Sequence, residues 1–199
     1  MRRSSKKLSP ESNATDQSTT LLDATREIFV REGLDGLSVR RVAEQAGCTT
    51  MVVYSRFGGK EGLIGAMFDE GFAALAEAQA EVAASLSPRV RVLELCRAYR
   101  RVAHDNPHHY ALMLGTHSGS FTPGEASRAK AMGTLAYLVA AVGAALPARA
   151  GRSAKANAAA SRIFAFCHGW AMLEQIGVLG DAVTEASFLH GIGALLDHA

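Results

Sequence analysis

The chain is poor in the residues that mark several protein classes. Its 199 residues include only three cysteines, Cys48, Cys96 and Cys167, which are widely spaced and lie among apolar neighbours. An odd, dispersed set of this kind excludes a disulfide scaffold. It predicts buried free thiols in a reducing cytoplasm.

Long apolar runs are also missing. Residues 1–20 begin basic and then become polar, without the apolar segment of a secretory signal. The least charged run, Ala131–Ala148, is rich in Ala and Gly and is short for a span that needs about 20 apolar residues. We therefore expect a cytoplasmic protein with no membrane partner.

An excess of charge of either sign is absent as well. The formal net charge is +2, which excludes a general polycation. Residues 1–62 hold ten Lys and Arg against eight Asp and Glu, whereas the remainder holds eleven of each. This imbalance is too small to show a nucleic-acid partner, although a phosphate-binding site can be local.

Period-two alternation and internal repeats are not found, whereas apolar residues recur at helical spacing along most of the chain. The expected fold class is all-α, with about nine helices. Residues 1–17 are polar and predict a flexible basic arm. The expected helices cover about 18–32, 39–46, 49–57, 60–85, 88–105, 108–114, 125–146, 153–178 and 184–198.

Catalytic signatures are missing too. The sequence holds no G-x-S-x-G, phosphate loop or dinucleotide fingerprint. His104 and His108 are spaced to share a helical face, but Pro107 lies between them and no carboxylate or cysteine completes a metal site. We expect no metal, no cofactor and no enzymatic activity.

The most informative segment that is present covers residues 42–63. Small apolar residues at Val42, Ala43 and Ala46 end at Gly47, which suits a tight turn. Thr49 is a natural cap for a second short helix, whose Val53 and Phe57 we assign to the core. A short helix held on a partner, with polar groups at its N-terminal end, is typical of a helix-turn-helix motif.

These residues resemble a known family. The helix ending at Gly33 and the order of the positions that follow are similar to the DNA-binding domain of TetR-type transcriptional regulators. The positions are Leu37–Ser38–Val39, Val42–Ala43, Ala46–Gly47, Tyr54, Phe57, Lys60–Glu61 and Leu63. The resemblance implies a helix-turn-helix domain over 18–64 and a helical effector-binding and dimerisation domain over 65–199.

The C-terminal part resembles the TetR subgroup named for Trp, His and Gly. The matching residues are Tyr99, Asn106–Pro107, Tyr110, Leu112–Met113, His168–Gly169 and Leu173–Glu174. Phe164 stands where the subgroup's Trp is expected, and Trp170 follows the Gly instead.

The resemblance implies a set of DNA contacts. Ser38 and Thr49 lie at helix N-termini, which suit a phosphate, and Thr50 and Met51 are the candidates for base edges. The expected phosphate clamps are Tyr54 and Lys60. Three arginines add salt-dependent affinity or form a solvated face: Arg40, Arg41 and Arg56.

Two further sites follow from the same resemblance. A small-molecule effector is expected among the middle helices, with ordinary core packing as the alternative for each residue: Tyr99, His109, Tyr110, Met113, Tyr137, Phe166 and Trp170. The last two helices are expected to form the homodimer interface through Phe188, Leu189, Ile192 and Leu196.

The predicted function is sequence-specific, dimeric binding to palindromic double-stranded DNA. The regulator is expected to be a repressor that a small organic ligand releases from its operator. The alternative is a helical small-molecule-binding protein with weak or no specific DNA binding.

Overall fold

The computed structural model describes residues 10–115, 121–148, 151–179 and 185–199. Over these ranges the chain forms α-helices and no strand, which confirms the all-α prediction. None of the described helices is long and apolar enough to cross a bilayer. The described residues form nine helices: α1 (Pro10–Gly36), α2 (Val39–Gln45), α3 (Thr50–Phe57), α4 (Lys60–Ala80), α5 (Pro88–Asp105), α6 (Pro107–Leu114), α7 (Glu125–Ala145), α8 (Arg152–Gln175) and α9 (Glu185–Asp197).

The first helix differs from its expected start. α1 begins at Pro10, where a ring-fixed φ suits the first helical turn, so residues 10–17 are helical and do not belong to an arm. Residues 1–9, the remaining part of the predicted arm, lie outside the described residues, as do 116–120, 149–150 and 180–183 in the expected loops and residue 184 at the expected start of the last helix. The regular helix ends as expected at Gly33, which has φ 65° and ψ −155°.

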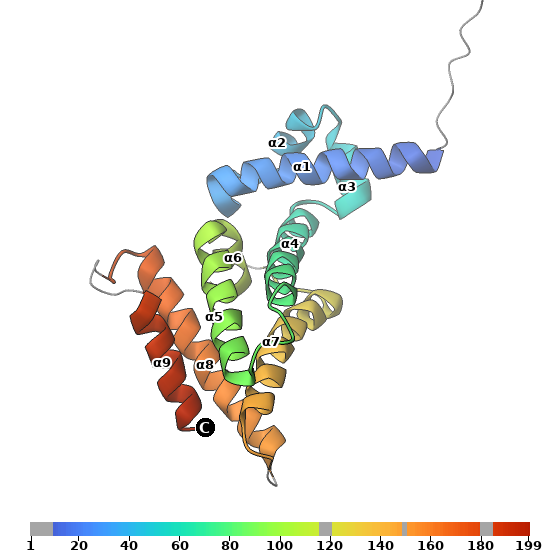
Figure 1. Cartoon of the computed structure of the whole chain (residues 1–199). Coiled ribbons are helices and arrows are strands. Elements are labelled where there is room, and N and C mark those ends of the chain that lie inside the picture. Colours follow the sequence, from blue (N-terminus) through green and yellow to red (C-terminus); the bar gives the residue numbers. More distant parts are fainter. Residues whose placement is uncertain (1–9, 116–120, 149–150, 180–184) are drawn as a thin grey trace, which may run out of the picture.

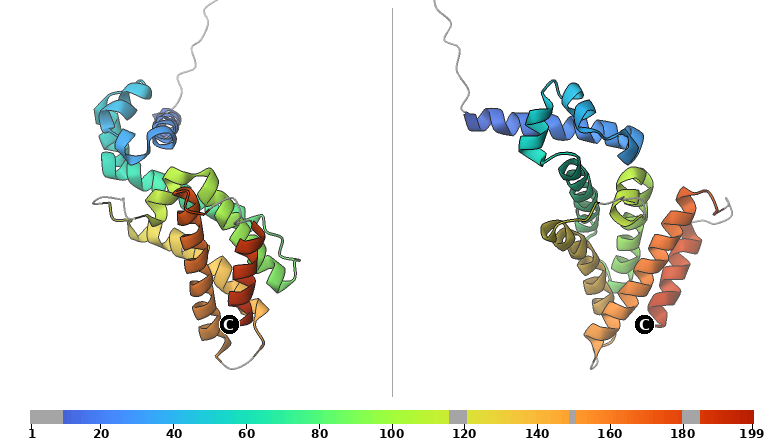
Figure 2. Two further views of the ribbon diagram at one scale, coloured as in Figure 1. Left: turned by 90° about the vertical axis from the view of Figure 1, so that its left-hand side faces the viewer. Right: turned by 180° about the vertical axis from the view of Figure 1, so that it is seen from behind.

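The helices form a head and a body (Figure 1). α1, α2 and α3 make a small unit in which α1 lies across one end of the molecule. α4 leaves this unit and runs into a body formed with α5–α9, and both further views show the same arrangement (Figure 2). The boundary expected between residues 64 and 65 therefore falls inside a continuous helix, α4.

One apolar core runs through both parts. In the head, Phe29, Val42 and Val53 have no exposed surface, and Leu63 carries this packing into α4. Fully buried side chains continue through the body at Met67 and Ile163. Burial of the apolar faces of these short helices supplies the stability that α2 and α3 lack by themselves.

The residues predicted for the dimer interface belong mainly to this core, which corrects that assignment. Phe188 and Ile192 have no exposed surface, and Leu196 is 7% exposed. Leu189 is half-buried and packs against the same cluster. The apolar face of α9 packs against α8 and α5 within the protomer, and Leu189 keeps part of its surface exposed.

Candidate functional site

The turn between α2 and α3 is built as the sequence predicts. Ser38 caps α2, its hydroxyl oxygen accepting from the Arg41 backbone N–H at 3.3 Å. Gly47 has φ 64°, which favours glycine, and makes the reversal. Thr49 occupies the cap position of α3, but its side chain makes no capping hydrogen bond. Its exposed hydroxyl is therefore free to bind an external acceptor or donor.

The start of α3 presents a mixed polar and apolar surface to solvent. Thr49 and Thr50 are exposed, while Met51 is 73% and Tyr54 is 56% exposed. Val53, on the opposite side of the helix, has no exposed surface and anchors α3 to the head. This face therefore offers solvent two hydroxyl groups, a thioether and a phenol on one short helix.

Three of the four predicted cations beside α3 are available to phosphate. Arg40, Arg56 and Lys60 are exposed and have no ion-pair partner among the residues that the structure describes. Arg41 instead binds Glu32 through both η nitrogens, at 2.5 and 2.8 Å, and donates to the Gly36 carbonyl at 2.9 Å. Its guanidinium therefore holds α2 against the end of α1.

Glycines position Lys60 beside Tyr54. Gly58 and Gly59 have φ values of 71° and 111°, and a Cβ on Gly59 would lie 3.0 Å from the Tyr54 ring. At Gly62, an added Cβ would lie 1.6 Å from the Phe57 carbonyl oxygen, so the start of α4 abuts the end of α3. The N-terminal end of α4, a favourable place for an anion, is thereby fixed next to the exposed face of α3.

A partly buried contact joins the head to the body. Arg26 of α1 donates from Nε to Glu70 Oε1 of α4 at 2.7 Å, and His109 Nε2 of α6 lies 3.4 Å from the same oxygen. The His109 ring packs edge-on against Phe29, with 4.9 Å between ring centroids. His109 thus lies at the junction between head and body.

The junction predicts a pH dependence. Burial alone would raise the pKa of Glu70, but contacts with His109 and Arg26 outweigh it and lower that pKa to about 2. A depressed carboxyl pKa stabilises the fold above about pH 4.5, and this contribution is lost as the pH falls from 4.5 toward 2. We expect Glu70→Gln to lower the free energy of unfolding at pH 7 by about 1–2 kcal/mol and to flatten its pH dependence in that window, allowing for partial solvent screening.

Denaturant unfolding at stepped pH values measures this effect. Glu77→Gln is the matched control, because Glu77 is exposed on the same helix. Equal pH profiles for wild type and Glu70→Gln would contradict the assignment.

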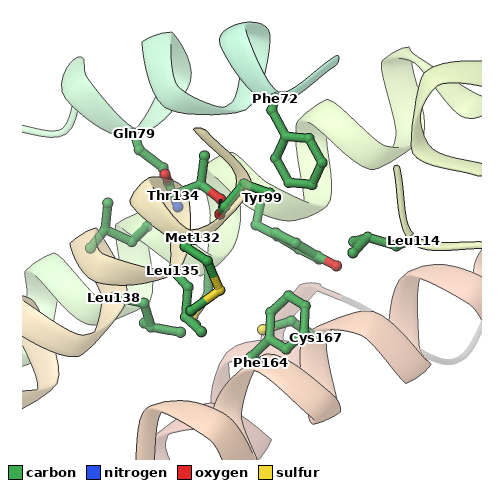
Figure 3. A pocket seen from close by; sticks show the side chains of 13 residues that line it. Phe72, Gln79, Tyr99, Leu114, Met132, Thr134, Leu135, Leu138, Phe164 and Cys167 are labelled. Carbon is green, nitrogen blue, oxygen red and sulfur yellow. Dashed lines mark hydrogen bonds between the residues drawn. The ribbon is translucent and has the colours of Figure 1, made fainter. Parts of the chain in front are cut away.

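A cavity lies among the middle helices. It has a volume of about 190 Å³ and is bounded by α4, α5, α7, α8 and the end of α6 (Figure 3). Among the residues that the structure describes, no charged side chain lines it. The lining residues are Phe72, Gln79, Leu95, Cys96, Tyr99, Leu114, Ala131, Met132, Thr134, Leu135, Leu138, Phe164 and Cys167.

Comparison with known proteins identifies the family to which this chain belongs. A family model described as bacterial regulatory proteins, tetR family, matches residues 21–67. A model described as tetracyclin repressor-like, C-terminal domain, matches residues 92–195, more than half of the chain. The chain belongs to the TetR family. The resemblance to the Trp-His-Gly subgroup stays a prediction, and no curated protein matches the chain.

Solved structures share the TetR fold. A protein of unknown function from Rhodococcus sp. RHA1 is 24% identical, with a TM-score of 0.73 over 92% of this chain and 94% of that one. BioQ of Mycobacterium smegmatis is 24% identical (TM-score 0.63, 91% and 96% coverage), and a further BioQ structure contains its natural double-stranded DNA operator. A TetR variant of Acinetobacter baumannii AYE in complex with minocycline is 18% identical (TM-score 0.63, 90% and 94%).

Of the effector residues predicted from the TetR resemblance, Tyr99 lines the cavity. Tyr110 lies behind it, its hydroxyl 2.8 Å from the Tyr99 hydroxyl and 2.7 Å from His168 Nδ1. Met113 lines a neighbouring groove with Phe68 and Phe121.

The other predicted effector residues lie away from the cavity. Tyr137 is 37% exposed. Phe166 and Trp170 pack on Phe188 between α8 and α9, with centroid distances of 5.9 and 5.4 Å. The resemblance and the side-chain types named them as candidates, but neither says which space a side chain faces.

The sequence analysis missed the two polar residues of the cavity wall, Gln79 and Thr134. Both are buried at positions where the neighbouring helix faces are apolar. The sequence signal that could have identified them is a single amide or hydroxyl within an otherwise apolar helix face.

The histidines considered as metal ligands do not converge: His104 bonds Asp105, and His108 packs against Gly33. Within the described residues, no three His, Cys, Asp or Glu side chains group as a metal site.

Proposed function

We propose that the protein is a transcriptional repressor that binds a palindromic operator as a homodimer and is released by a small organic ligand. The observation that carries this proposal is the exposed N-terminal face of α3, with Thr50, Met51 and Tyr54 on a helix anchored by buried Val53. Hydroxyl groups and an apolar side chain at this place suit base edges and thymine methyl groups. The operator complex of BioQ and the minocycline complex of TetR support the two kinds of ligand.

Helix α6 provides a route between the cavity and the DNA-binding head. Its C-terminal Leu114 lines the cavity, and Tyr110 bonds to the cavity residue Tyr99. Its N-terminal residues His108 and His109 pack against Phe29 of α1. A ligand that displaces the wall of the cavity therefore acts on an element that touches α1. Release requires that the ligand bind the DNA-incompetent arrangement more tightly.

The second copy is expected on the outer faces of α8 and α9, in place of the interface predicted from sequence. Ala158, Ala165, Gly169, Leu173 and Ile176 are exposed on one side at helical spacing near α8. Small residues allow close approach of helices, and the last two add apolar area. A two-fold dimer would place the α3 helices in successive major grooves about 34 Å apart or more.

We expect Ala165→Arg to make the protein monomeric at micromolar concentration, because it puts a charge in the centre of this face. Sedimentation velocity measures the change, with the wild type sedimenting as a dimer. Ala129→Arg, at an exposed position of α7, is the control that stays dimeric. A dimeric Ala165→Arg protein would contradict the assigned face.

We assign the described helices to an operator-binding head over 18–64 and an effector-binding and dimerisation body over 65–199, joined by α4. The three cysteines are unpaired, which favours the cytoplasm, where the operator lies. The role is binding, without catalysis.

Deleting the gene in its host tests the repressor role. Transcripts from promoters that the protein occupies should rise in the deletion strain. They should return to their wild-type level when the intact gene is restored, but not when Tyr54→Ala, Lys60→Ala is supplied. A fall in these transcripts would identify an activator and overturn the repressor role.

A further inference from the structure

The cavity wall contains a buried amide oxygen without a partner. The Gln79 side chain is 5% exposed, and its Oε1 atom has no hydrogen-bond partner among the described residues. The Gln79 side chain extends from α4 toward Thr134 of α7 at the edge of the cavity (Figure 3). A buried polar atom left unpaired costs stability, and it is expected to find a partner in a bound ligand.

The polar groups near Gln79 are arranged to accept a hydrogen bond. The Thr134 hydroxyl donates to the Ala131 carbonyl at 2.7 Å, which leaves its lone pairs free. At the far side, the Tyr99 hydroxyl is already engaged with Tyr110. The unfilled capacity of the cavity therefore lies at Gln79 and Thr134.

The rest of the wall sets the charge and size of the ligand. Within the part of the chain that the structure describes, the lining holds no charged side chain, so an ion would lose its hydration without compensation. The volume of about 190 Å³ is below that of most drug-sized sites. It exceeds the cavity of about 150 Å³ that binds benzene in another protein.

We propose that the effector is a small uncharged alcohol or phenol, largely apolar, whose hydroxyl donates to Gln79. A hydroxyl both donates and accepts, so it satisfies the Gln79 amide in either orientation, and its single proton goes to Gln79 or to Thr134 but not to both. The hydrocarbon part of the ligand fills the space between Phe72, Leu135 and Phe164. This inference rests on the proposed function, because it names the ligand of the same cavity.

Calorimetric titration of the full-length protein with three matched probes tests the class. The probes are 2-phenylethanol, ethylbenzene and phenylacetate, which share one hydrocarbon frame and differ in hydroxyl and charge. We expect 2-phenylethanol to bind about tenfold more tightly than ethylbenzene, from one hydrogen bond to a buried acceptor. Phenylacetate should show no binding.

Variants of the protein test whether the hydroxyl of the bound alcohol contacts Gln79. Gln79→Leu removes the amide at similar size, and it should reverse the preference so that ethylbenzene binds more tightly. Without any probe, this variant should melt at a higher temperature than the wild type, because the unpaired group is gone. Leu135→Val is the control that keeps the preference for the alcohol, and Ala131→Leu should fill the cavity and abolish binding of every probe.

Several outcomes would overturn the inference. They are equal or tighter binding of ethylbenzene by the wild type, binding of phenylacetate, an unchanged preference in Gln79→Leu, or no binding of any probe. Operator binding is measured in the same preparations without probes. Failure of the ligand class with intact operator binding leaves the proposed regulator in place, whereas absent operator binding overturns the regulator whatever the probes do.

Discussion

Replacing Tyr54 and Lys60 together by alanine is expected to lower operator affinity at least about 100-fold without changing the melting temperature. Each side chain offers a hydrogen bond or a charge to a phosphate, and a dimer loses every contact twice. Tyr54 and Lys60 are exposed, so the folded protomer depends little on them. Fluorescence anisotropy with operator DNA at several salt concentrations measures the affinity, and the loss of Lys60 should also reduce the salt slope.

A matched variant separates these contacts from general effects of charge and surface. Tyr137→Ala with Lys155→Ala changes the same residue types at exposed positions of α7 and α8. It should bind the operator as tightly as the wild type. Affinity of the Tyr54 and Lys60 variant within about threefold of the wild type would remove these residues from the interface.

Gly62→Ala is expected to destabilise the protein by about 3 kcal/mol, or roughly 6–12 °C in melting temperature, and to abolish operator binding. The added Cβ would lie 1.6 Å from the Phe57 carbonyl oxygen, a backbone atom that cannot move aside alone. The junction between α3 and α4 must open, and the exposed face of α3 then loses its place beside Lys60.

Gly133→Ala is the control for Gly62→Ala. Gly133 also lies inside a helix, α7, but a Cβ there meets nothing within 4 Å. Helix propensity alone should therefore stabilise it by up to about 1 kcal/mol. Thermal melts of the two variants should shift in opposite directions, and a Gly62→Ala protein as stable as the wild type would contradict the close contact.

The helices were predictable because their signals are local. Ser38, Gly47 and the apolar spacing around Val53 depend on neighbours within a few residues, and the structure places all three as expected. The start of α1 at Pro10 was missed because residues 10–17 are polar and lack the apolar stripe that the helix carries from Leu21 onward.

The sites were less predictable because they depend on distant partners. The same apolar face of α9 suits a dimer interface or a protomer core, and only the packing of α5 and α8 over Phe188 distinguishes them. From sequence alone Arg41 is a candidate phosphate contact, whereas in the fold its guanidinium is bound to Glu32. The cavity likewise depends on how four long helices, α4, α5, α7 and α8, pack together. The sequence of one helix does not specify this packing.

Selection of genomic DNA fragments by the purified protein at fixed salt, read by sequencing, tests the central claim most directly. The account predicts enrichment of one short palindrome whose half-sites lie about one helical turn or more apart. Binding without an enriched motif, lost on a modest increase in salt, would contradict it, because phosphate attraction alone would then explain the affinity.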